Sequence, residues 1–533
     1  MPPPERSLRH AASRGASRGP RARAGSALAS AALLCVVAAA AFANPPHGVP
    51  IVTRHRALIG GRELAYTAEV GRIAIRDVET GKPRGYMFYT AYRLASRRSA
   101  RGDGARRRKE VERGGGHARR PVMFLWNGGP GAPSTWVNFD LAGPKLIQGT
   151  RLLDNPDSWL SAADLVMVDP IGTGFSRPTR RKYLKEFAGT VGDVASVTEF
   201  VRCWLILHDE VGAPVFLAGE SWGAGRAAHV AYALEQRGIR VNGLVLISGG
   251  FGLAKHYGPA TLEQALGVVD MASTALYWHR SDPALGTSVA TLRRRAEAWV
   301  RRTYAPALAR IGRLSAGERD RIARELARFT GIAPDLIDHR TLVITPREFR
   351  TELLKSEGKV LYLLDGRRTS PPSGAGDATV LAYLREDLGY RSDLPYLGLE
   401  KLTQGFAPSG LYPQGVGERW NYATGPVTAA QVRAAIQAAI ASGAGPPRLG
   451  PPLPGTAEAV ALDPRLRVLV AVGMYDPYDQ CARGEETFGS LPPGLRRAIT
   501  FKCYAGGHEM YLGSPRIRAE LTHDVLGLIE SAE

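Results

Sequence analysis

The sequence is poor in cysteine. Only four of its 533 residues are cysteine, at positions 35, 203, 481 and 503, which excludes a disulfide-dense scaffold. Cys481 and Cys503 are able to pair in an oxidising compartment, and the sequence leaves this open. No CxxC pair or HExxH motif occurs, so we predict no metal and no cofactor.

Positive charge is abundant, but it is concentrated in two segments, residues 1–43 and residues 97–120. The net charge is +19, and residues 97–120 alone hold ten Lys or Arg against three acids. A basic face interleaved with aromatic side chains, as in nucleic-acid binders, is missing, so no nucleic-acid partner is expected. Residues 97–120 are rich in Gly and Arg and poor in apolar residues, which predicts a basic flexible insertion. A polyanion contact through this insertion is an open alternative.

The first 43 residues have the pattern of an export signal. Six Arg precede the apolar run 27–42, ALASAALLCVVAAAAF, which ends in the small-x-small pattern of Ala41 and Ala43. We predict a signal peptide over residues 1–43, cleaved after Ala43, and a periplasmic or secreted protein. The alternative is an uncleaved membrane anchor. No later stretch is long and apolar enough to span a bilayer.

Short apolar runs alternate with helical patterns on either side of a long helical stretch. Residues 62–94 alternate as strands do around a turn at 79–83, which predicts a hairpin. The expected buried strands are Val122–Trp126, Leu165–Val168, Val215–Ala218, Leu244–Ile247, Val468–Val472 and Ile499–Tyr504. Continuous apolar runs between helices predict an α/β protein with a mostly parallel sheet covered on both faces.

This alternation sets the expected domain organisation. Residues 44–253 form the first part of the α/β core, and residues 426–533 form the second part. Between them, residues 254–425 are helical and irregular, with charged runs such as GERDRIARELARF. We therefore predict a helical cap inserted into the core.

A G-x-S-x-G stretch stands where a buried strand turns into a helix. Residues 215–230 read VFLAGESWGAGRAAHV. This is typical of a nucleophile elbow, in which a strained turn exposes the serine hydroxyl, although an ordinary Gly-rich turn also fits. We predict that Ser221 is the nucleophile.

Two further residues lie just after predicted strands. Asp476 follows VLVAVGMY and His508 follows ITFKCYAGG, and each alone suits an ordinary turn. The carboxyl ends of parallel strands share one edge of a sheet, and the chain order Ser221, Asp476, His508 is the α/β-hydrolase order. We predict a catalytic triad in which His508 takes the serine proton and Asp476 orients the imidazole. An oxyanion also needs hydrogen-bond donors, and the Trp222 N–H follows the serine directly.

Six motifs together resemble those of the serine carboxypeptidase family, with its bacterial members closest. The motifs are FLWNGGPG (124–131), NPDSW (155–159), VDPIGTGFS (168–176), GESWG (219–223), GxxD (473–476) and AGGHEMY (505–511). The resemblance covers about residues 62–530 and implies an α/β-hydrolase fold with a helical cap. It implies release of C-terminal residues from peptides at acid pH, with a peptide carrying a free C-terminus as the partner.

The resemblance also implies roles for residues around the triad. Gly129 and Trp222 correspond to the oxyanion hole, and Asn127 and Glu220 to the residues that bind the terminal carboxylate of the substrate. Glu220 must be protonated to donate a hydrogen bond to a carboxylate, so this binding weakens as Glu220 ionises.

The sequence departs from the family pattern next to these residues. A gap-free alignment of the motifs places Leu141, with Asp140 adjacent, where the family often has a second Glu that shares a proton with the first. Glu509 stands where Met usually follows the catalytic His. A carboxylate at 509 is expected to raise the pKa of His508 and to repel an anionic substrate end.

The leading hypothesis is an exported serine carboxypeptidase-like hydrolase that acts through an acyl-enzyme. The second is an esterase or acyltransferase that uses the same Ser221, Asp476 and His508. The third is a non-catalytic module that holds a polyanion on residues 97–120.

Overall fold

The computed structural model describes residues 49–95, 119–371, 377–398, 420–442, 449–512 and 514–532. The predicted signal peptide lies outside the described residues, and so does the basic insertion 97–120 except for its last two residues. Arg120 donates to the Asp164 carboxylate at 2.8 Å. The positive charge at this end of the insertion is therefore already paired with an acid of the fold.

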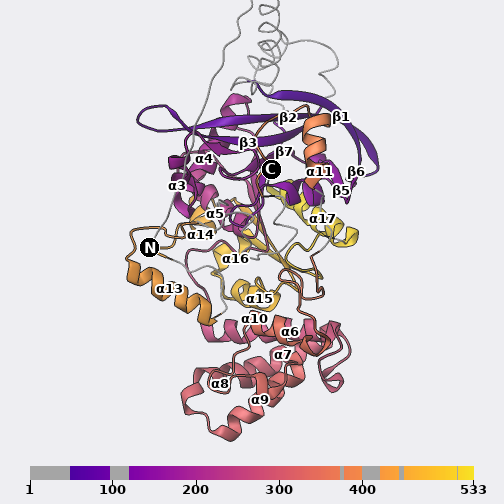
Figure 1. The fold of residues 1–533 in the computed structure, drawn as a ribbon, viewed down its shortest axis with the longest axis vertical. Helices are drawn as coiled ribbons and strands as arrows, with labels where there is room; N and C mark the ends of the chain where they lie inside the picture. Colours follow the sequence, from indigo (N-terminus) through magenta and orange to yellow (C-terminus); the bar gives the residue numbers. More distant parts are fainter. Residues whose placement is uncertain are drawn as a thin grey trace, which may run out of the picture. The chain divides into compact units, whose positions relative to one another are not determined.

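One ten-stranded sheet runs through the described part of the chain (Figure 1). Its strands are β1 (Ile51–Ile59), β2 (Arg62–Arg76), β3 (Pro83–Leu94), β4 (Val122–Trp126), β7 (Asp164–Asp169), β8 (Arg177–Pro178), β9 (Val215–Glu220), β10 (Gly243–Ile247), β11 (Arg467–Gly473) and β12 (Ile499–Tyr504). Their order is β1-β2-β3-β7-β4-β9-β10-β11-β12, with β8 beside β3. Pairings from β7 to β12 are parallel, and those of β1, β2 and β3 are antiparallel.

The predicted strands and the hairpin are confirmed. β2 pairs with β3 across the turn at 79–83, and the six apolar runs form β4, β7, β9, β10, β11 and β12. β1 is an additional strand that the patterns did not predict, because its sequence IVTRHRALI places Arg and His among the apolar residues. As an edge strand, β1 keeps alternate side chains in solvent. Strands β5 (Lys145–Gln148) and β6 (Arg151–Asp154) form a separate small sheet.

Helices cover both faces of the sheet because each buried strand sends alternate side chains in opposite directions. Phe124 and Leu217 pack on one face, and Met123 and Phe216 pack on the other. The first face is covered by α4 (Thr190–Leu207), α5 (Trp222–Glu235), α14 (Thr456–Leu462) and α16 (Pro493–Ala498), and the second by η2 (Val137–Ala142) and α17 (Pro515–Ala532). The chain therefore has the α/β-hydrolase architecture that its motif order predicts.

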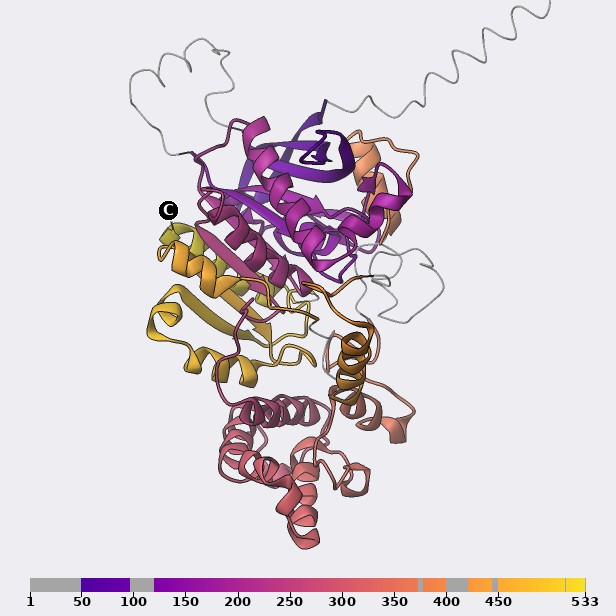
Figure 2. The same cartoon turned by 90° about the vertical axis from the view of Figure 1, so that its left-hand side faces the viewer.

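The chain leaves the sheet after β10 and enters a group of helices with its own apolar core (pink in Figures 1 and 2). These helices are α6 (Ala260–Tyr277), α7 (Val289–Trp299), α8 (Ala305–Ala309), α9 (Ala316–Thr330) and α10 (Pro346–Glu352), joined by shorter turns that include η6 (Val300–Tyr304). The group contacts the core through α15 (Cys481–Ser490), where the Ala482 N–H donates to the Asp270 carboxylate at 3.1 Å.

The described residues of the predicted cap, 254–425, do not share one apolar core. Its later part, α11 (Asp377–Ala382) and η10 (Tyr383–Asp387), packs on the sheet. The Tyr383 ring meets the Phe139 ring at 5.5 Å, and the Tyr396 hydroxyl donates to Asp169 at 2.8 Å. Buried aromatic side chains draw this segment onto the core, whereas the residues before it bury theirs among themselves.

Further helices are α3 (Leu184–Phe187), whose Phe187 packs on the first face of the sheet, and α13 (Ala429–Ser442). Within the described ranges, no helix combines the length and the apolarity that crossing a bilayer requires.

A disulfide joins Cys481, at the start of α15, to Cys503 in β12. This settles the pairing that the sequence left open, and Cys203 is the free thiol of the described residues. The bond closes a loop with a sequence separation of 22. It ties together the segments that follow Asp476 and precede His508.

We expect the double substitution Cys481→Ser/Cys503→Ser to lower the free energy of unfolding by about 3 kcal/mol, because the reduced chain regains the entropy of an open loop of this length. Urea denaturation followed by tryptophan fluorescence measures the change. Cys203→Ser is the matched control and should change stability by less than about 0.5 kcal/mol. Equal stability of the double variant and the parent protein would contradict the stabilising role of the bond.

Candidate active site

Ser221 occupies a strained turn between β9 and α5. Its backbone has φ 56° and ψ −126°, a region that side-chain-bearing residues rarely adopt and that costs about 1–3 kcal/mol. The Ser221 N–H donates to the Ile247 carbonyl on β10 at 2.7 Å, which holds the turn. A Cβ atom at Gly219 would lie 1.9 Å from the Gly223 carbonyl oxygen. The turn therefore closes only because glycines flank the serine, which explains the GESWG pattern.

His508 and Asp476 meet at the same edge of the sheet. The His508 Nδ1 lies 2.7 Å from an Asp476 carboxylate oxygen, and both side chains are buried. The other Asp476 oxygen accepts the Tyr478 N–H at 2.8 Å. Burial alone would lower the pKa of the imidazole, but the Asp476 carboxylate raises it to about 10. Glu220 and Glu509 add to this increase when they are ionised.

The loops that carry these two residues are held by neighbours on both sides. The His508 N–H donates to the Leu364 carbonyl at 2.6 Å, and the Gly366 N–H donates to the Tyr475 carbonyl at 2.9 Å. The Ser248 hydroxyl donates to the His508 carbonyl at 2.6 Å. The segment that returns from the helical group therefore helps to hold the His508 and Asp476 loops together.

No hydrogen bond joins the Ser221 hydroxyl to the His508 imidazole in the described structure. The serine side chain is partly exposed, and its backbone lies at the carboxyl edge that β9 shares with β11 and β12. In free enzymes such a contact is often long and tightens when substrate binds. The structure thus pairs Asp476 with His508 and places Ser221 at the same edge.

The glycine-rich loop after β4 lies against the serine turn. A Cβ atom at Gly128 would be 2.5 Å from the Trp222 nitrogen and 2.6 Å from the Glu220 carbonyl oxygen. Gly129 has φ +104°, which favours glycine. Neither the Gly129 N–H nor the Trp222 N–H donates to an acceptor within the described ranges. Two unused donors therefore flank Ser221.

Asn127 and Glu220 form a buried pair beside the serine. The Asn127 amide donates to a Glu220 carboxyl oxygen, and the Tyr511 hydroxyl donates to the same oxygen at 3.0 Å. Both Asn127 and Glu220 are 2% exposed. Burial raises the pKa of Glu220 to about 7, so this carboxyl holds a proton in mildly acidic solution and can then act as a donor.

Known proteins match the part of the chain that contains this turn. The family model described as serine carboxypeptidase matches residues 111–239. Over these residues the chain is similar to the serine carboxypeptidase family. The matched residues include Asn127, Gly129 and Ser221, whereas Asp476 and His508 lie beyond them.

Two similar curated proteins come from fungi. The chain is 29% identical over 154 residues to "Pheromone-processing carboxypeptidase kex1" of Neosartorya fischeri, which covers 26% of this chain and 24% of that protein. It is 33% identical over 135 residues to the protein of the same name from Aspergillus niger, covering 25% and 22%. The chain thus matches about a quarter of the length of these relatives.

A solved structure aligns over a longer stretch but at low similarity. The peroxisomal α/β-hydrolase Lpx1 of Saccharomyces cerevisiae covers 87% of this chain and 89% of its own, with 11% identity and a TM-score of 0.31. The strand order described above is the basis of the fold assignment.

The departures from the serine carboxypeptidase pattern gather around Glu220. Leu141 is fully buried in the apolar core, whereas burial and the Glu220 carboxyl raise the pKa of Asp140 to about 8. Burial also raises the pKa of Glu509 well above its usual value, and Glu220 adds to that increase. The carboxyls of Glu220, Glu509 and Asp140 all act on the Tyr511 hydroxyl.

These carboxyls have few partners. One oxygen of Asp140 and one of Glu509 have no hydrogen-bond partner within the described residues. The buried Glu220 and Glu509 and the partly buried Asp140 cannot all be ionised at low cost when they lie close to one another. The site therefore holds protons on carboxyl groups in neutral solution. Sequence patterns placed Asp140 and Glu509 next to family positions, but assigned no role to Tyr511.

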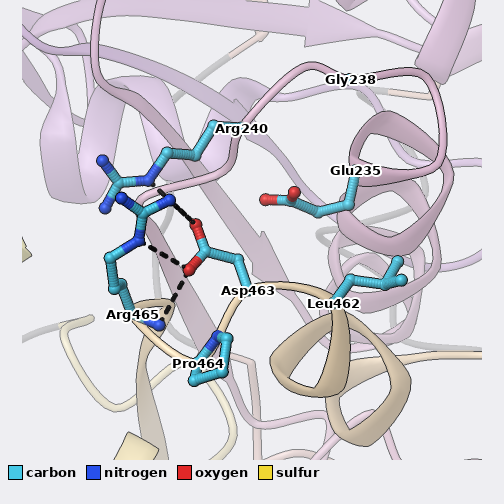
Figure 3. Close-up of a pocket in the computed structure, with 7 residues that line it drawn as sticks. All are labelled: Glu235, Gly238, Arg240, Leu462, Asp463, Pro464 and Arg465. Atoms are coloured by element: carbon cyan, nitrogen blue, oxygen red, sulfur yellow. Dashed lines mark hydrogen bonds and ion pairs between the residues drawn. The ribbon is translucent and has the colours of Figure 1, made fainter.

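A hollow lies at the amino ends of the strands, opposite the ends where Ser221 lies (Figure 3). It is lined by Glu235, Gly238, Arg240, Leu462, Asp463, Pro464 and Arg465, next to the starts of β10 and β11. The Asp463 carboxylate accepts from Arg465 at 2.8 Å and from Arg240 at 3.0 Å, and these contacts lower its pKa to about 2. Because the charges satisfy each other, this hollow lacks the chemistry of the Ser221 edge.

We expect Glu509→Gln to lower the pKa of His508, because the substitution removes a carboxylate that stabilises the imidazolium. NMR titration of histidine labelled at Cε1 measures the pKa, and His508→Gln assigns the signal. Glu520→Gln, an exposed carboxyl on α17 paired with Arg516, is the control and should leave the pKa unchanged. An identical titration in Glu509→Gln would show that Glu509 stays protonated throughout and has no effect on the base.

Proposed function

We propose that this chain is a serine-type carboxypeptidase-like hydrolase that releases C-terminal residues from peptides through an acyl-enzyme. One observation carries the proposal: Ser221 sits on a strained, glycine-flanked turn at the sheet edge where His508 and Asp476 are paired at 2.7 Å. The similarity of residues 111–239 to the serine carboxypeptidase family supports it.

In this mechanism Ser221 attacks the carbonyl of the last peptide bond, and His508 takes the serine proton. The Asp476 carboxylate holds the imidazole through Nδ1, which leaves Nε2 for the proton. The Gly129 and Trp222 N–H groups receive the oxyanion, and each such donor is worth roughly 3 kcal/mol. His508 then gives its proton to the departing amine, and water releases the acyl group by the same steps.

Protonated carboxyls keep the base available. An imidazole with a raised pKa holds its proton and cannot accept another. Glu220 and Glu509 raise the pKa of His508 only while they are ionised, and burial favours the protonated form of each, with the pKa of Glu220 raised to about 7. The same proton on Glu220, together with the Asn127 amide, would bind the terminal carboxylate of the substrate.

A second candidate is an esterase or acyltransferase that uses the same three residues. The cluster of Glu220, Asp140 and Glu509 favours it, since any ionisation there repels an anionic substrate end. A substrate without a terminal carboxylate is free of that penalty.

We expect Ser221→Ala to reduce kcat by roughly 10⁴- to 10⁶-fold, because no other side chain replaces the nucleophile. Hydrolysis of a p-nitrophenyl ester and labelling by a fluorophosphonate measure the loss, and circular dichroism checks the fold. Ser531→Ala is the control, since its hydroxyl donates to the Leu528 carbonyl on α17 at 2.9 Å and contacts none of the three residues. Substantial turnover in a folded Ser221→Ala protein would reject this site.

We expect peptides with a free C-terminus to be cleaved faster than the same peptides with an amidated end. Their advantage in kcat/KM should fall as pH rises through about 7, because Glu220 then loses the proton that it donates. Glu220→Gln, which cannot ionise, should flatten this pH dependence. Equal rates for the two ends at every pH would rule out carboxypeptidase specificity and leave the esterase candidate.

A further inference from the structure

Arg226 is a buried charge placed directly behind the serine turn. It lies on the first turns of α5, five residues after Ser221, and is 1% exposed. Its Nε donates to the Asp193 carboxylate of α4 at 2.6 Å. Its Nη1 donates to the Asn127 carbonyl at 2.9 Å. One guanidinium therefore links the nucleophile helix, a neighbouring helix and the end of β4.

The Asn127 carbonyl is an important point of attachment because Gly128 and Gly129 follow it. Gly128 lies so close to Trp222 and Glu220 that a Cβ atom at this position would clash with their backbone atoms. A displacement of the Asn127 peptide by a few tenths of an ångström would move the Gly129 N–H relative to Ser221. Donors for an oxyanion act only when they are fixed in advance at the right distance.

Arg226 complements contacts on the other side of Asn127. The Asn127 side-chain oxygen accepts the Trp136 N–H at 3.0 Å and the Val137 N–H at 3.2 Å, and its amide donates to Glu220. These bonds hold the side chain, whereas Arg226 holds the backbone. The two sets together fix the peptide in both position and orientation.

Stability alone is a poor reason for this ion pair. Taking two charges out of water costs about as much as their attraction returns, and apolar residues of similar size often stabilise a core better. Asp193 is 2% exposed, so this cost applies in full. A guanidinium has a rigid planar fork that can span two acceptors at once, which an ammonium group cannot reproduce.

We propose that Arg226, oriented by Asp193, is a positioning residue that holds the Asn127–Gly129 segment against the serine turn, so that the Gly129 and Trp222 N–H groups converge on the oxyanion. This inference rests on the proposed function of Ser221. It concerns the transition state rather than the binding of the ground-state substrate.

Arg226→Lys tests the proposal, because it keeps a positive charge beside Asp193 but removes the fork. With a p-nitrophenyl ester, we expect kcat to fall roughly 10- to 100-fold while KM stays within about threefold, since a misplacement of about 1 Å costs on the order of 10² in rate. The inhibition constant of an alkylboronic acid, which forms a tetrahedral adduct with serine, should rise by the same factor as kcat falls. The melting temperature should change by only a few degrees.

Arg202→Lys is the matched control. Arg202 pairs with Glu199 on α4, is half-exposed and has no contact with Asn127, so its kinetics should equal those of the parent protein. The proposal is overturned if Arg226→Lys keeps kcat and boronic acid affinity within threefold of the parent. It is also overturned if KM rises in proportion to the loss of kcat, which would indicate a general disturbance of the site.

If Arg226→Lys does not fold, the double variant Arg226→Met/Asp193→Asn replaces it, because that variant leaves no unpaired buried charge. The same split between kcat and KM is expected. Failure of the proposed function is a separate result: the parent protein would then show no Ser221-dependent hydrolysis of the ester. Normal hydrolysis that is insensitive to Arg226 rejects only the positioning role.

Discussion

The close approach of two glycine-rich segments is the constraint on which the rest of this site depends. The turn around Ser221 and the loop after β4 approach so closely that a Cβ atom at Gly128 or Gly219 would lie 2.5 Å or less from a backbone atom. Neighbouring parallel strands β4 and β9 bring the two segments side by side. The strained backbone of Ser221 persists because this surrounding structure is well packed. The two free N–H groups beside the serine follow from the same contact.

Burial gives the neighbouring acids their chemistry. Glu220, Asp140 and Glu509 lie near Tyr511 in an environment that disfavours their charged forms. Such carboxyls are hydrogen-bond donors while they hold a proton, and they turn into repelling charges as they ionise. His508 must both accept and release a proton, so Asp476 has to stabilise the imidazolium without preventing the loss of its proton. The balance between these groups links substrate choice to pH.

Packing outside the sheet also contributes to the site. The segment around Leu364 and Gly366 returns from the helical group and bonds to the loops of His508 and Asp476. The Cys481–Cys503 bond ties the same two loops from another side. Arg226 and Asp193 act in the same way on the loop after β4. Each catalytic loop is therefore held by a partner from a different element of the fold.

The sequence by itself determined the β2–β3 hairpin, the six buried strands, the order of Ser221, Asp476 and His508, and the serine turn, because apolar runs and glycine spacing are local signals. Only the tertiary structure decided that Asp476 bonds His508, that Arg226 reaches Asn127, and that residues 377–396 pack on the sheet rather than in a cap. These contacts join residues that lie tens to hundreds of positions apart, and no local pattern records them. These contacts form when pairing of the strands aligns the ends of β4, β9, β11 and β12. Buried charged side chains then lie within reach of their partners.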